Sequence, residues 1–381
     1  MRSFNEIKNV IIKIGSSSLV NKDLSVNLWQ IDNIFKSISE LMNKGISVSI
    51  VTSGAIATGM HELGLTTKPK DMALKQACAA VGQSKLMEGY NHIASKYNIV
   101  TGQILINHDD FQKRSRLTHL ENTLNSMLKN KIVPIINEND ALSVDEIKVG
   151  DNDTLSALVA TLIKADLLIL FSDIDGLFTK NPKIYSDATL INEVKTIDEK
   201  IYNMVSGSTT MVGTGGMETK INAAIITTNC GVNMIICNSE RIKDLTNIVS
   251  GEEIGTLFIK SQTPVLAKEG WMMFNTNPEG EIIIDKGLEK KLKEKRVSIL
   301  PVGIKEVNGD FAKNSVINVR TIDGNIICKG ITNYSSSEIR LFIYADNKKD
   351  IEKILGLVKK KEIIHADNLV RMEDEYERII K

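Results

Sequence analysis

Short apolar runs rich in β-branched residues recur along the first 260 residues, and each one stops abruptly at small or polar residues. In the clearest case, residues 132–136 lead straight into the polar cluster 137–140, Asn-Glu-Asn-Asp. Runs of this kind are typical of strands that are buried on both faces of a parallel sheet. Six or more of them alternate with segments whose apolar residues have helical spacing. This alternation predicts an α/β fold, a three-layer sandwich with a mainly parallel central sheet.

The position of each expected element follows from the same pattern. The strands are expected at residues 10–14, 46–51, 99–106, 132–136, 166–171 and 232–237. The helices are expected at residues 28–42, 71–97 with an interruption near Gly82, 114–130, 217–230 and in a segment that begins at Thr154. Open α/β sheets bind their ligands in a crevice outside the carboxyl ends of the strands. We therefore expect the functional residues directly after these strands.

Two polar clusters flank the strand at residues 132–136. One is residues 137–140, which include Asn137 and Asp140, and the other is residues 151–153, directly before the helix that begins at Thr154. Asp and Asn are good N-caps, so one interpretation is a solvated turn followed by a capped helix. The closeness of two clusters of carboxylates and amides favours a second interpretation, a wall that binds a small polar molecule.

Two further strands end in turns of small, hydroxyl-bearing residues. Lys13 interrupts the first apolar run just before Gly15 and three serines. It is either a solvated lysine on an edge strand or a cation that faces a cavity or counter-charge. The second run ends at Ser53 and Gly54. Ser53 could cap the next helix, but Gly54 lets a ligand approach the backbone closely, which favours a binding site.

A glycine-rich loop at residues 212–216 opens the helix expected at residues 217–230. Glycines followed by Lys220 at a helix N-terminus make a natural anion site, because orphan N–H groups and the positive dipole end both favour negative charge. The loop is not a Walker A motif, since G-x-x-x-x-G-K-[ST] is absent from the chain. It repeats the strand, loop and helix order found at Lys13, Ser53 and Asp173, which indicates one shared site.

Composition limits the class of protein. The 381 residues include 47 Lys and Arg and 47 Asp and Glu, so the chain lacks the overall positive charge that is typical of proteins that bind nucleic acids. No apolar run approaches membrane-spanning length and the N-terminus lacks a signal-peptide core, so we expect a cytoplasmic protein. The histidines show no metal spacing, and the cysteines are too scattered to predict disulfides or a metal site. The cysteines are Cys78, Cys230, Cys237 and Cys328.

The pattern changes after residue 260, where short strands separated by turn residues predict a small β-rich second domain. We expect a catalytic domain at residues 1–260, a linker at 261–278, the β-rich domain at 279–360 and a C-terminal tail at 361–381 that packs on it or extends it. The basic run 286–296 is either a solvated helix or an RNA-binding patch, and interspersed leucines favour the helix.

Several motifs together resemble those of the glutamate 5-kinases, a branch of the amino-acid kinase family. The resemblance covers nearly the whole chain, and the C-terminal residues resemble a PUA domain, a module named after pseudouridine synthases and archaeosine transglycosylases. The pair Asn-Glu-Asn-Asp and Gly-Asp-Asn-Asp is the most specific part, whereas the glycine loop is shared more widely. The motifs lie at residues 13–17, 51–55, 137–140, 148–153 and 213–220.

The resemblance implies transfer of the ATP γ-phosphoryl group to the side-chain carboxylate of L-glutamate, the first step of proline biosynthesis. The implied catalytic residues are Lys13 and Lys220. The implied glutamate-binding residues are Ser53, Gly54, Asn137, Asp140, Asp151, Asn152 and Asp153, of which Asp140 and Asn152 take the amino end. The implied ATP-binding residues are Lys13, Ser172, Asp173, Thr214, Gly215, Gly216, Met217, Glu218, Thr219 and Lys220. Mg²⁺ is expected to be held mainly by nucleotide phosphates and water, not by a protein metal site.

The chemistry suits these residue types. A carboxylate nucleophile has a reference pKa of about 4.3 and needs no general base at neutral pH, which fits a sequence without the catalytic loop of protein kinases. Departures from the family pattern are modest: Ser172 replaces a usual threonine, Asn181 a common aspartate, and Asn314 a usual glycine, although Asn tolerates positive φ.

The family also implies partners beyond glutamate and ATP. They are proline as a feedback inhibitor, a homo-oligomer, and glutamyl phosphate reductase as the acceptor of a channelled product. Two alternatives remain at this point: a kinase of another small anion, such as carbamate, aspartate or uridylate, on the same fold, and an RNA-binding protein that acts through the PUA-like domain.

Overall fold

A computed structural model of the chain describes residues 1–4, 6–107, 110–111, 114–142, 152–182, 184–198, 201, 204, 216–264, 270, 272–273, 276, 278–344 and 362–372. The chain forms two compact units, Met1–Val265 and Leu266–Lys381.

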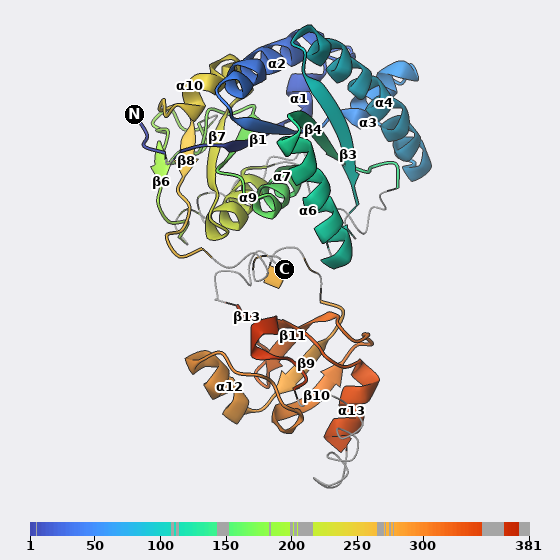
Figure 1. The fold of residues 1–381 in the computed structure, drawn as a ribbon, viewed down its shortest axis with the longest axis vertical. Helices are drawn as coiled ribbons and strands as arrows, with labels where there is room; N and C mark the ends of the chain where they lie inside the picture. The colour runs from blue at the N-terminus through green and yellow to red at the C-terminus, as the bar shows by residue number, and fades with distance from the viewer. Residues whose placement is uncertain are drawn as a thin grey trace. The chain divides into compact units, whose positions relative to one another are not determined.

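The first unit is built on a sheet with the strand order β3-β4-β2-β1-β5-β7-β8-β6 (Figure 1). Neighbouring strands are parallel from β3 to β7, while β8 runs antiparallel to β7 and parallel to β6. The sheet is therefore mainly parallel, which confirms the predicted α/β fold. The strands are β1 (Asn9–Ile14), β2 (Ser47–Val51), β3 (Val100–Ile106), β4 (Ile132–Glu138), β5 (Leu167–Ser172), β6 (Glu193–Val194), β7 (Asn233–Asn238) and β8 (Thr256–Phe258).

Helices cover both faces of this sheet, as the three-layer prediction requires. Figure 1 shows α2, α4 and α10 over one face and α6, α7 and α9 over the other. The bounds are α1 (Ser16–Leu19), α2 (Leu28–Asn43), α3 (Ala55–Glu62), α4 (Met72–Lys96), α6 (Arg114–Lys129), α7 (Asn152–Leu162), α9 (Met217–Asn229) and α10 (Leu245–Val249).

The alternation of β1 decides which layer Lys13 faces. Val10, Ile12 and Ile14 pack into the core with α2 and α4. Successive strand residues point to opposite faces of a sheet, so Lys13 points towards the layer that contains α7 and α9. Because β1 lies between β2 and β5, the alternative of a solvated lysine on an edge strand is wrong.

Helix α4 is continuous across the interruption that the sequence suggested near Gly82. Here glycine permits contact between two helix backbones. A Cβ at Gly82 would lie 1.8 Å from the carbonyl oxygen of Ala55, and one at Gly59 would lie 1.8 Å from that of Cys78. Helices α3 and α4 are thus packed backbone against backbone.

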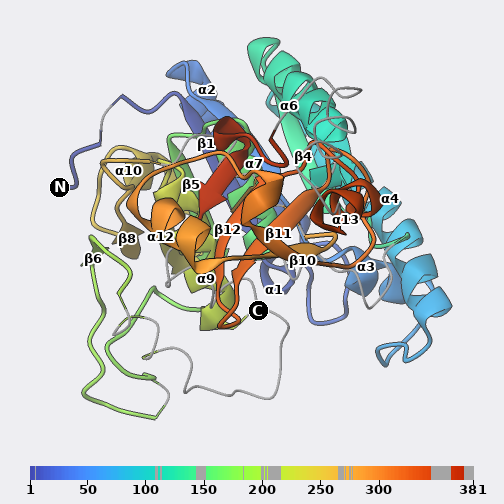
Figure 2. The ribbon, with the colours of Figure 1, turned by 90° about the horizontal axis from the view of Figure 1, so that it is seen from below.

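The second unit holds a sheet with the order β10-β9-β11-β12-β13, which confirms the predicted β-rich domain. Its helices α12 and α13 lie on either side of this sheet in both views (Figure 1 and Figure 2). Asn314 adopts a φ of 70°, the conformation that made asparagine acceptable there. The bounds are β9 (Glu281–Ile284), α12 (Lys286–Glu294), β10 (Ile304–Asn308), β11 (Val316–Thr321), β12 (Ile326–Ile331), α13 (Ser336–Tyr344) and β13 (Leu369–Arg371).

Among the residues the structure describes, no helix combines the length and apolar character needed to cross a bilayer.

Candidate active site

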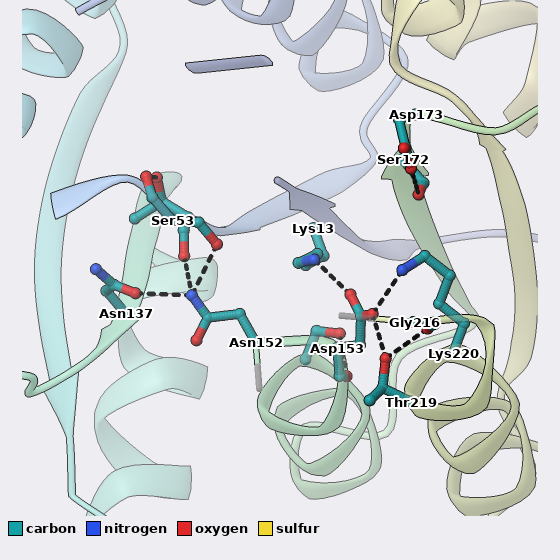
Figure 3. A network of polar contacts seen from close by, with 12 residues as sticks. Lys13, Ser53, Asn137, Asn152, Asp153, Ser172, Asp173, Gly216, Thr219 and Lys220 are labelled. Carbon is teal, nitrogen blue, oxygen red and sulfur yellow. Dashed lines mark hydrogen bonds and ion pairs between the residues drawn. The ribbon is translucent and has the colours of Figure 1, made fainter. Parts of the chain in front are cut away.

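Four neighbouring strands, β4, β2, β1 and β5, bring the predicted site residues to one edge of the sheet. Since these strands are parallel, their carboxyl ends meet there. Lys13 lies near the end of β1, Ser53 follows β2, Asn137 lies near the end of β4, and Ser172 ends β5. Figure 3 shows the side chains of this edge together with those at the start of α7 and α9.

A buried carboxylate joins the two predicted catalytic lysines. Asp153, in the first turn of α7, is 1% exposed, and Lys220, in the first turn of α9, is 4% exposed. Lys220 Nζ lies 3.0 Å from Asp153 Oδ2, and Lys13 Nζ pairs with Oδ1 (Figure 3). Burial alone would raise the pKa of the Asp153 carboxyl, but the charges of Lys13 and Lys220 outweigh it and hold that pKa below its usual value.

The charge balance of this cluster indicates what it can bind. Two ammonium groups share one carboxylate, so the cluster keeps an excess positive charge in a mostly buried place. A buried charge needs a partner to offset its lost hydration. An anion such as a phosphate group would supply it.

The N-terminus of α9 adjoins the same carboxylate. Thr219 Oγ1 donates to Asp153 Oδ2 at 3.1 Å and lies 2.8 Å from the Gly216 carbonyl oxygen. Gly216 is the N-cap, and it provides no side chain to cap the first N–H groups. Met217 and Glu218 complete the first turn. A helix N-terminus with a glycine N-cap, beside Lys220, favours the binding of an anion. Of the remaining predicted residues, Asp151, Thr214 and Gly215 lie outside the described residues.

A cluster of uncharged amides lies beside the charged cluster. Asn152 Nδ2 donates to the Thr52 carbonyl oxygen at 2.7 Å, to Ser53 Oγ at 2.8 Å and to Asn137 Oδ1 at 3.0 Å (Figure 3). Gly54, the N-cap of α3, has a φ of 96° that favours glycine. Ser53 therefore does not act as the N-cap of α3, and its hydroxyl instead joins the amide cluster.

Helix α4 supports this cluster with two side chains that the sequence analysis missed. Gln83 Oε1 accepts from Asn137 Nδ2 at 2.8 Å, and the Tyr90 hydroxyl lies 2.9 Å from Thr52 Oγ1. Both side chains are buried, and they are seven residues apart, two helical turns, on one face of α4. The sequence did offer one indication, a polar residue at a helix position that is expected to be buried. It did not show which strand the side chain of this residue would contact.

The remaining predicted residues that the structure describes are Asp140, Ser172 and Asp173. Asp140 follows β4 and lines a cavity of about 920 Å³ together with residues of α4. Ser172 Oγ donates to Asp173 Oδ1 at 3.1 Å. Figure 3 shows this pair apart from Asp153, at the end of β5.

Comparison with known proteins identifies two families along the chain. The model of the amino acid kinase family matches residues 8–238, and that of the PUA domain matches residues 280–355. A glutamate 5-kinase from Caldanaerobacter subterraneus subsp. tengcongensis is 42% identical over 364 residues, which are 96% of this chain and 98% of the relative. A glutamate 5-kinase from Carboxydothermus hydrogenoformans is 42% identical over 368 residues, with the same two coverages.

The solved structures that match this chain are more distant in sequence. Isopentenyl phosphate kinase from T. acidophilum, solved as a product complex, is 18% identical with a TM-score of 0.47, and the match covers 66% of this chain and 100% of that one. UMP kinase from Bacillus anthracis is 18% identical with a TM-score of 0.47 and covers 68% of this chain and 98% of that one.

Proposed function

Since the chain belongs to the amino acid kinase family, and its full-length relatives are glutamate 5-kinases, we propose that it transfers the ATP γ-phosphoryl group to the side-chain carboxylate of L-glutamate. The observation that carries the proposal is the buried cluster of Lys13, Asp153 and Lys220 with its excess positive charge. It lies beside uncharged amides that can hold a polar acceptor. The product would be L-glutamyl 5-phosphate, which is formed in the first step of proline biosynthesis from glutamate.

The two lysines supply the charge that the reaction needs. The acceptor carboxylate and the γ-phosphoryl group are both anions, so their approach must be offset by positive charge. Lys13 and Lys220 have this role in the proposal. Asp153 holds their ammonium groups close together and is a positioning residue. This role differs from the glutamate contact expected from the motif, because both of its oxygens are occupied by lysines.

Glutamate would lie along the amide cluster. Its side-chain carboxylate is ionised at neutral pH, which removes the need for a general base. Ser53, Asn137 and Asn152, with Gly54 and Asp151 beside them, provide polar contacts without adding a cation that would compete for the nucleophile. Asp140 would take the α-ammonium group.

ATP would lie at the N-terminus of α9, with residues 214–220 around its phosphates and Ser172 and Asp173 on the nucleotide side. In the described residues, no three His, Cys, Asp or Glu side chains gather to hold a metal ion. We propose that Mg²⁺ arrives on the nucleotide and keeps most of its waters, because it dehydrates reluctantly, and that it neutralises phosphate charge.

The decisive experiment is turnover of ATP with glutamate, with the acyl phosphate trapped by hydroxylamine. We expect glutamyl hydroxamate to form in step with ADP. ADP without hydroxamate, or hydroxamate only from aspartate or carbamate, would overturn the proposal in favour of another small-anion kinase. Retention of RNA that falls with salt, without any hydroxamate, would favour the RNA-binding alternative.

The proposal includes the setting implied by the family: a cytoplasmic homo-oligomer that is inhibited by proline and passes its labile product to glutamyl phosphate reductase. Its support is the similarity to glutamate 5-kinases over nearly the full chain.

A further inference from the structure

A single buried hydroxyl joins two distant points of the chain beyond β5. Thr256, the first residue of β8, is fully buried. Its Oγ1 accepts from the Leu177 N–H at 2.8 Å and donates to the Ile191 carbonyl oxygen at 2.6 Å. A hydroxyl has one hydrogen to donate, and here Ile191 receives it. Thr256 therefore holds Leu177 through its acceptor and Ile191 through its donor.

The two residues that Thr256 holds form the base of an antiparallel ribbon. The Ile191 N–H donates to the Leu177 carbonyl oxygen at 2.8 Å, and Phe178 forms an antiparallel bridge with Leu190. The ribbon thus leaves the sheet at Leu177 and returns to it at Ile191. Because Thr256 bonds to both of these residues, its hydroxyl keeps the base of the ribbon closed against β8.

The turn between β5 and this ribbon carries residues that we expect on the nucleotide side of the site. β5 ends at Ser172, whose Oγ donates to Asp173 Oδ1 at 3.1 Å (Figure 3). Residues 173–176 then connect it to Leu177. A connection this short has little freedom once both of its ends are held. Fixing Leu177 therefore limits the positions that Asp173 can take.

The turn lies directly against the Thr256 hydroxyl. A Cβ at Gly176 would lie 2.5 Å from Thr256 Oγ1, so glycine allows this close approach. The backbone of Thr256 is held in turn by pairing with β7. Arg2 adds to this support, since its guanidinium donates to the carbonyl oxygens of Ile254 at 2.7 Å and Gly255 at 2.6 Å. The hydroxyl therefore projects from a fixed backbone and can impose a geometry on the turn.

We propose that Thr256 is a positioning residue for ATP, whose hydroxyl holds the turn at residues 172–176 in the conformation that receives the nucleotide. This inference rests on the proposed function, since it concerns the nucleotide side of the same site. A loop that is already held in its bound conformation costs less to order when the ligand arrives. β8 lies on the other side of β1 from β2 and β4, which carry the amide cluster. The effect should therefore fall on ATP and not on glutamate.

Two substitutions at Thr256 isolate the hydroxyl. Thr256→Val keeps the branched shape and removes the hydroxyl, whereas Thr256→Ser keeps the hydroxyl and removes a methyl group. Thr256→Val should raise the KM for ATP about 10-fold, because the Leu177 N–H and the Ile191 carbonyl lose a buried partner. The KM for glutamate and kcat should change little. Thr256→Ser should keep the KM for ATP near that of the parent protein.

Thr332, in the second unit, offers a matched control. It is also fully buried, and its Oγ1 donates to the Tyr334 carbonyl oxygen at 2.8 Å and accepts from the Tyr334 N–H at 3.1 Å. Thr332→Val therefore removes the same kind of donor and acceptor pair. It should lower the Tm, as Thr256→Val does, but leave the KM for ATP unchanged. Comparison of the two variants separates a loss of stability from a loss of nucleotide binding.

Hydrogen exchange on the parent protein gives a test that needs no variant, should Thr256→Val fail to fold. ATP should slow exchange of the Leu177 and Ile191 amides, because a bound nucleotide that holds the turn also holds the base of the ribbon. The Tyr334 amide, which donates to Thr332, is the control and should not respond. Exchange at Leu177 and Ile191 that ATP leaves unchanged would overturn the inference.

The kinetic outcomes are equally distinct. A KM for ATP that Thr256→Val leaves unchanged, or that Thr332→Val raises as much, would overturn the inference. Thr256→Ser as impaired as Thr256→Val would overturn it too. Calorimetric titration of ATP without glutamate separates the inference from the proposed function. Binding that Thr256→Val weakens, in a protein that forms no glutamyl hydroxamate, would reject the glutamate reaction alone. Binding indifferent to Thr256→Val would reject the inference.

Discussion

Asp153 receives two ammonium groups from different parts of the sheet and helix layers, one from β1 and one from α9. The carboxylate is buried and its pKa is held low, so moving it away from the lysines would take a buried counter-charge from both of them. The lysines are consequently held close together before any ligand arrives. Removing a lysine and removing the carboxylate should have different effects, the first on the reaction and the second on stability.

Lys220→Ala should lower kcat by about 100-fold or more, because it removes a positive group placed where charge develops in the transition state. Steady-state ADP release with saturating glutamate measures it. Lys180→Ala is a matched control, since Lys180 is also paired with an aspartate, Asp187, but lies exposed at the surface. An unchanged kcat in Lys220→Ala would remove Lys220 from the reaction.

Asp153→Asn should lower the unfolding free energy by about 3–5 kcal/mol, the usual cost of removing one partner of a buried ion pair. ATP should then raise the Tm of the variant more than that of the parent protein, because a bound anion offsets the charge of the two ammonium groups that have lost Asp153. Differential scanning calorimetry with and without nucleotide tests both expectations. The exposed Asp187→Asn, on the partner of Lys180, should change neither. Equal ATP-induced shifts in the two variants would contradict this role for Asp153.

The sequence predicted the residues that follow strands better than the residues that support them. Lys13, Ser53, Asn137 and Asn152 could be placed at one edge because parallel strands share a carboxyl end. Gln83 could not be identified in that way. Its contact with Asn137 depends on how α4 packs against the sheet, which no local pattern in the sequence specifies.

At the scale of whole elements, the main differences concern where strands and helices end. β4 was expected to stop at residue 136, but it continues to Glu138 because Leu105 and Ile106 of β3 pair with Asn137 and Glu138. Asn137 therefore has the fixed backbone of a strand instead of a turn. Pairing with a neighbouring strand decided this end, and the polarity of the sequence could not.

Proline should compete with glutamate if both use the groups around Asn137 to Asn152. Proline shares the α-carboxylate and a cationic amine with glutamate but lacks the reacting carboxylate, so it would occupy the site without a nucleophile. Proline should raise the apparent KM for glutamate and be overcome by excess glutamate, since mutually exclusive ligands weaken each other's binding. Initial rates over a grid of both concentrations provide the test. Inhibition that persists at saturating glutamate would indicate a separate site.

Lys329 lies on β12 of the second unit, and its side chain hydrogen-bonds to the backbone of Met273 and Thr276. It is 1% exposed, and its Nζ donates to the carbonyl oxygens of Met273 and Thr276, each at 3.1 Å. Burial lowers the pKa of Lys329 to about 8 from an ordinary 10.5. A neutral amine still has two N–H groups, which is the number of carbonyls it meets.

The unfolding free energy should therefore rise with pH between about 8 and 10.5, the pKa values of Lys329 in the folded and the unfolded chain. Between pH 8 and 10.5 the unfolded chain binds a proton at Lys329 that the folded chain has released, so raising the pH favours the folded state. We expect the parent protein to gain about 1–3 kcal/mol relative to Lys329→Met between these limits. Denaturant unfolding at several pH values measures the difference, with the exposed Lys313→Met as a control. A difference that is constant with pH would contradict the lowered pKa.

At the scale of the whole molecule, the chain divides at Val265, and each unit has its own hydrophobic core. The change of pattern after residue 260 predicted two domains because a helix period gave way to short strands. It could not show that Leu369–Arg371, within the expected tail, forms β13 beside β12. A three-residue strand has too little periodicity to be recognised without its partner.

A chain that ends at Val265 should fold and transfer phosphate. It keeps strand β8 and the hydrogen bond from the Ser261 N–H to the Thr228 carbonyl oxygen at 2.9 Å. It also keeps Pro264, which lies beside Gly231. Its thermal unfolding should be a single cooperative transition, and it should form glutamyl hydroxamate. An insoluble or inactive product would show that the second unit completes the catalytic one.

The backbone contact between α3 and α4 fixes the spacing of the site residues that these two helices position. Ser53 lies just before α3 and Gln83 lies on α4, and at Gly59 and Gly82 the two helix backbones are in contact with no side chain between them. The distance between Ser53 and Gln83 is therefore set by the packing of α3 against α4 and adjusts little to a ligand. We therefore expect kcat/KM to fall for acceptors one methylene shorter or longer than glutamate, such as aspartate and 2-aminoadipate, because a spacing set by backbone contact adjusts little to a different length.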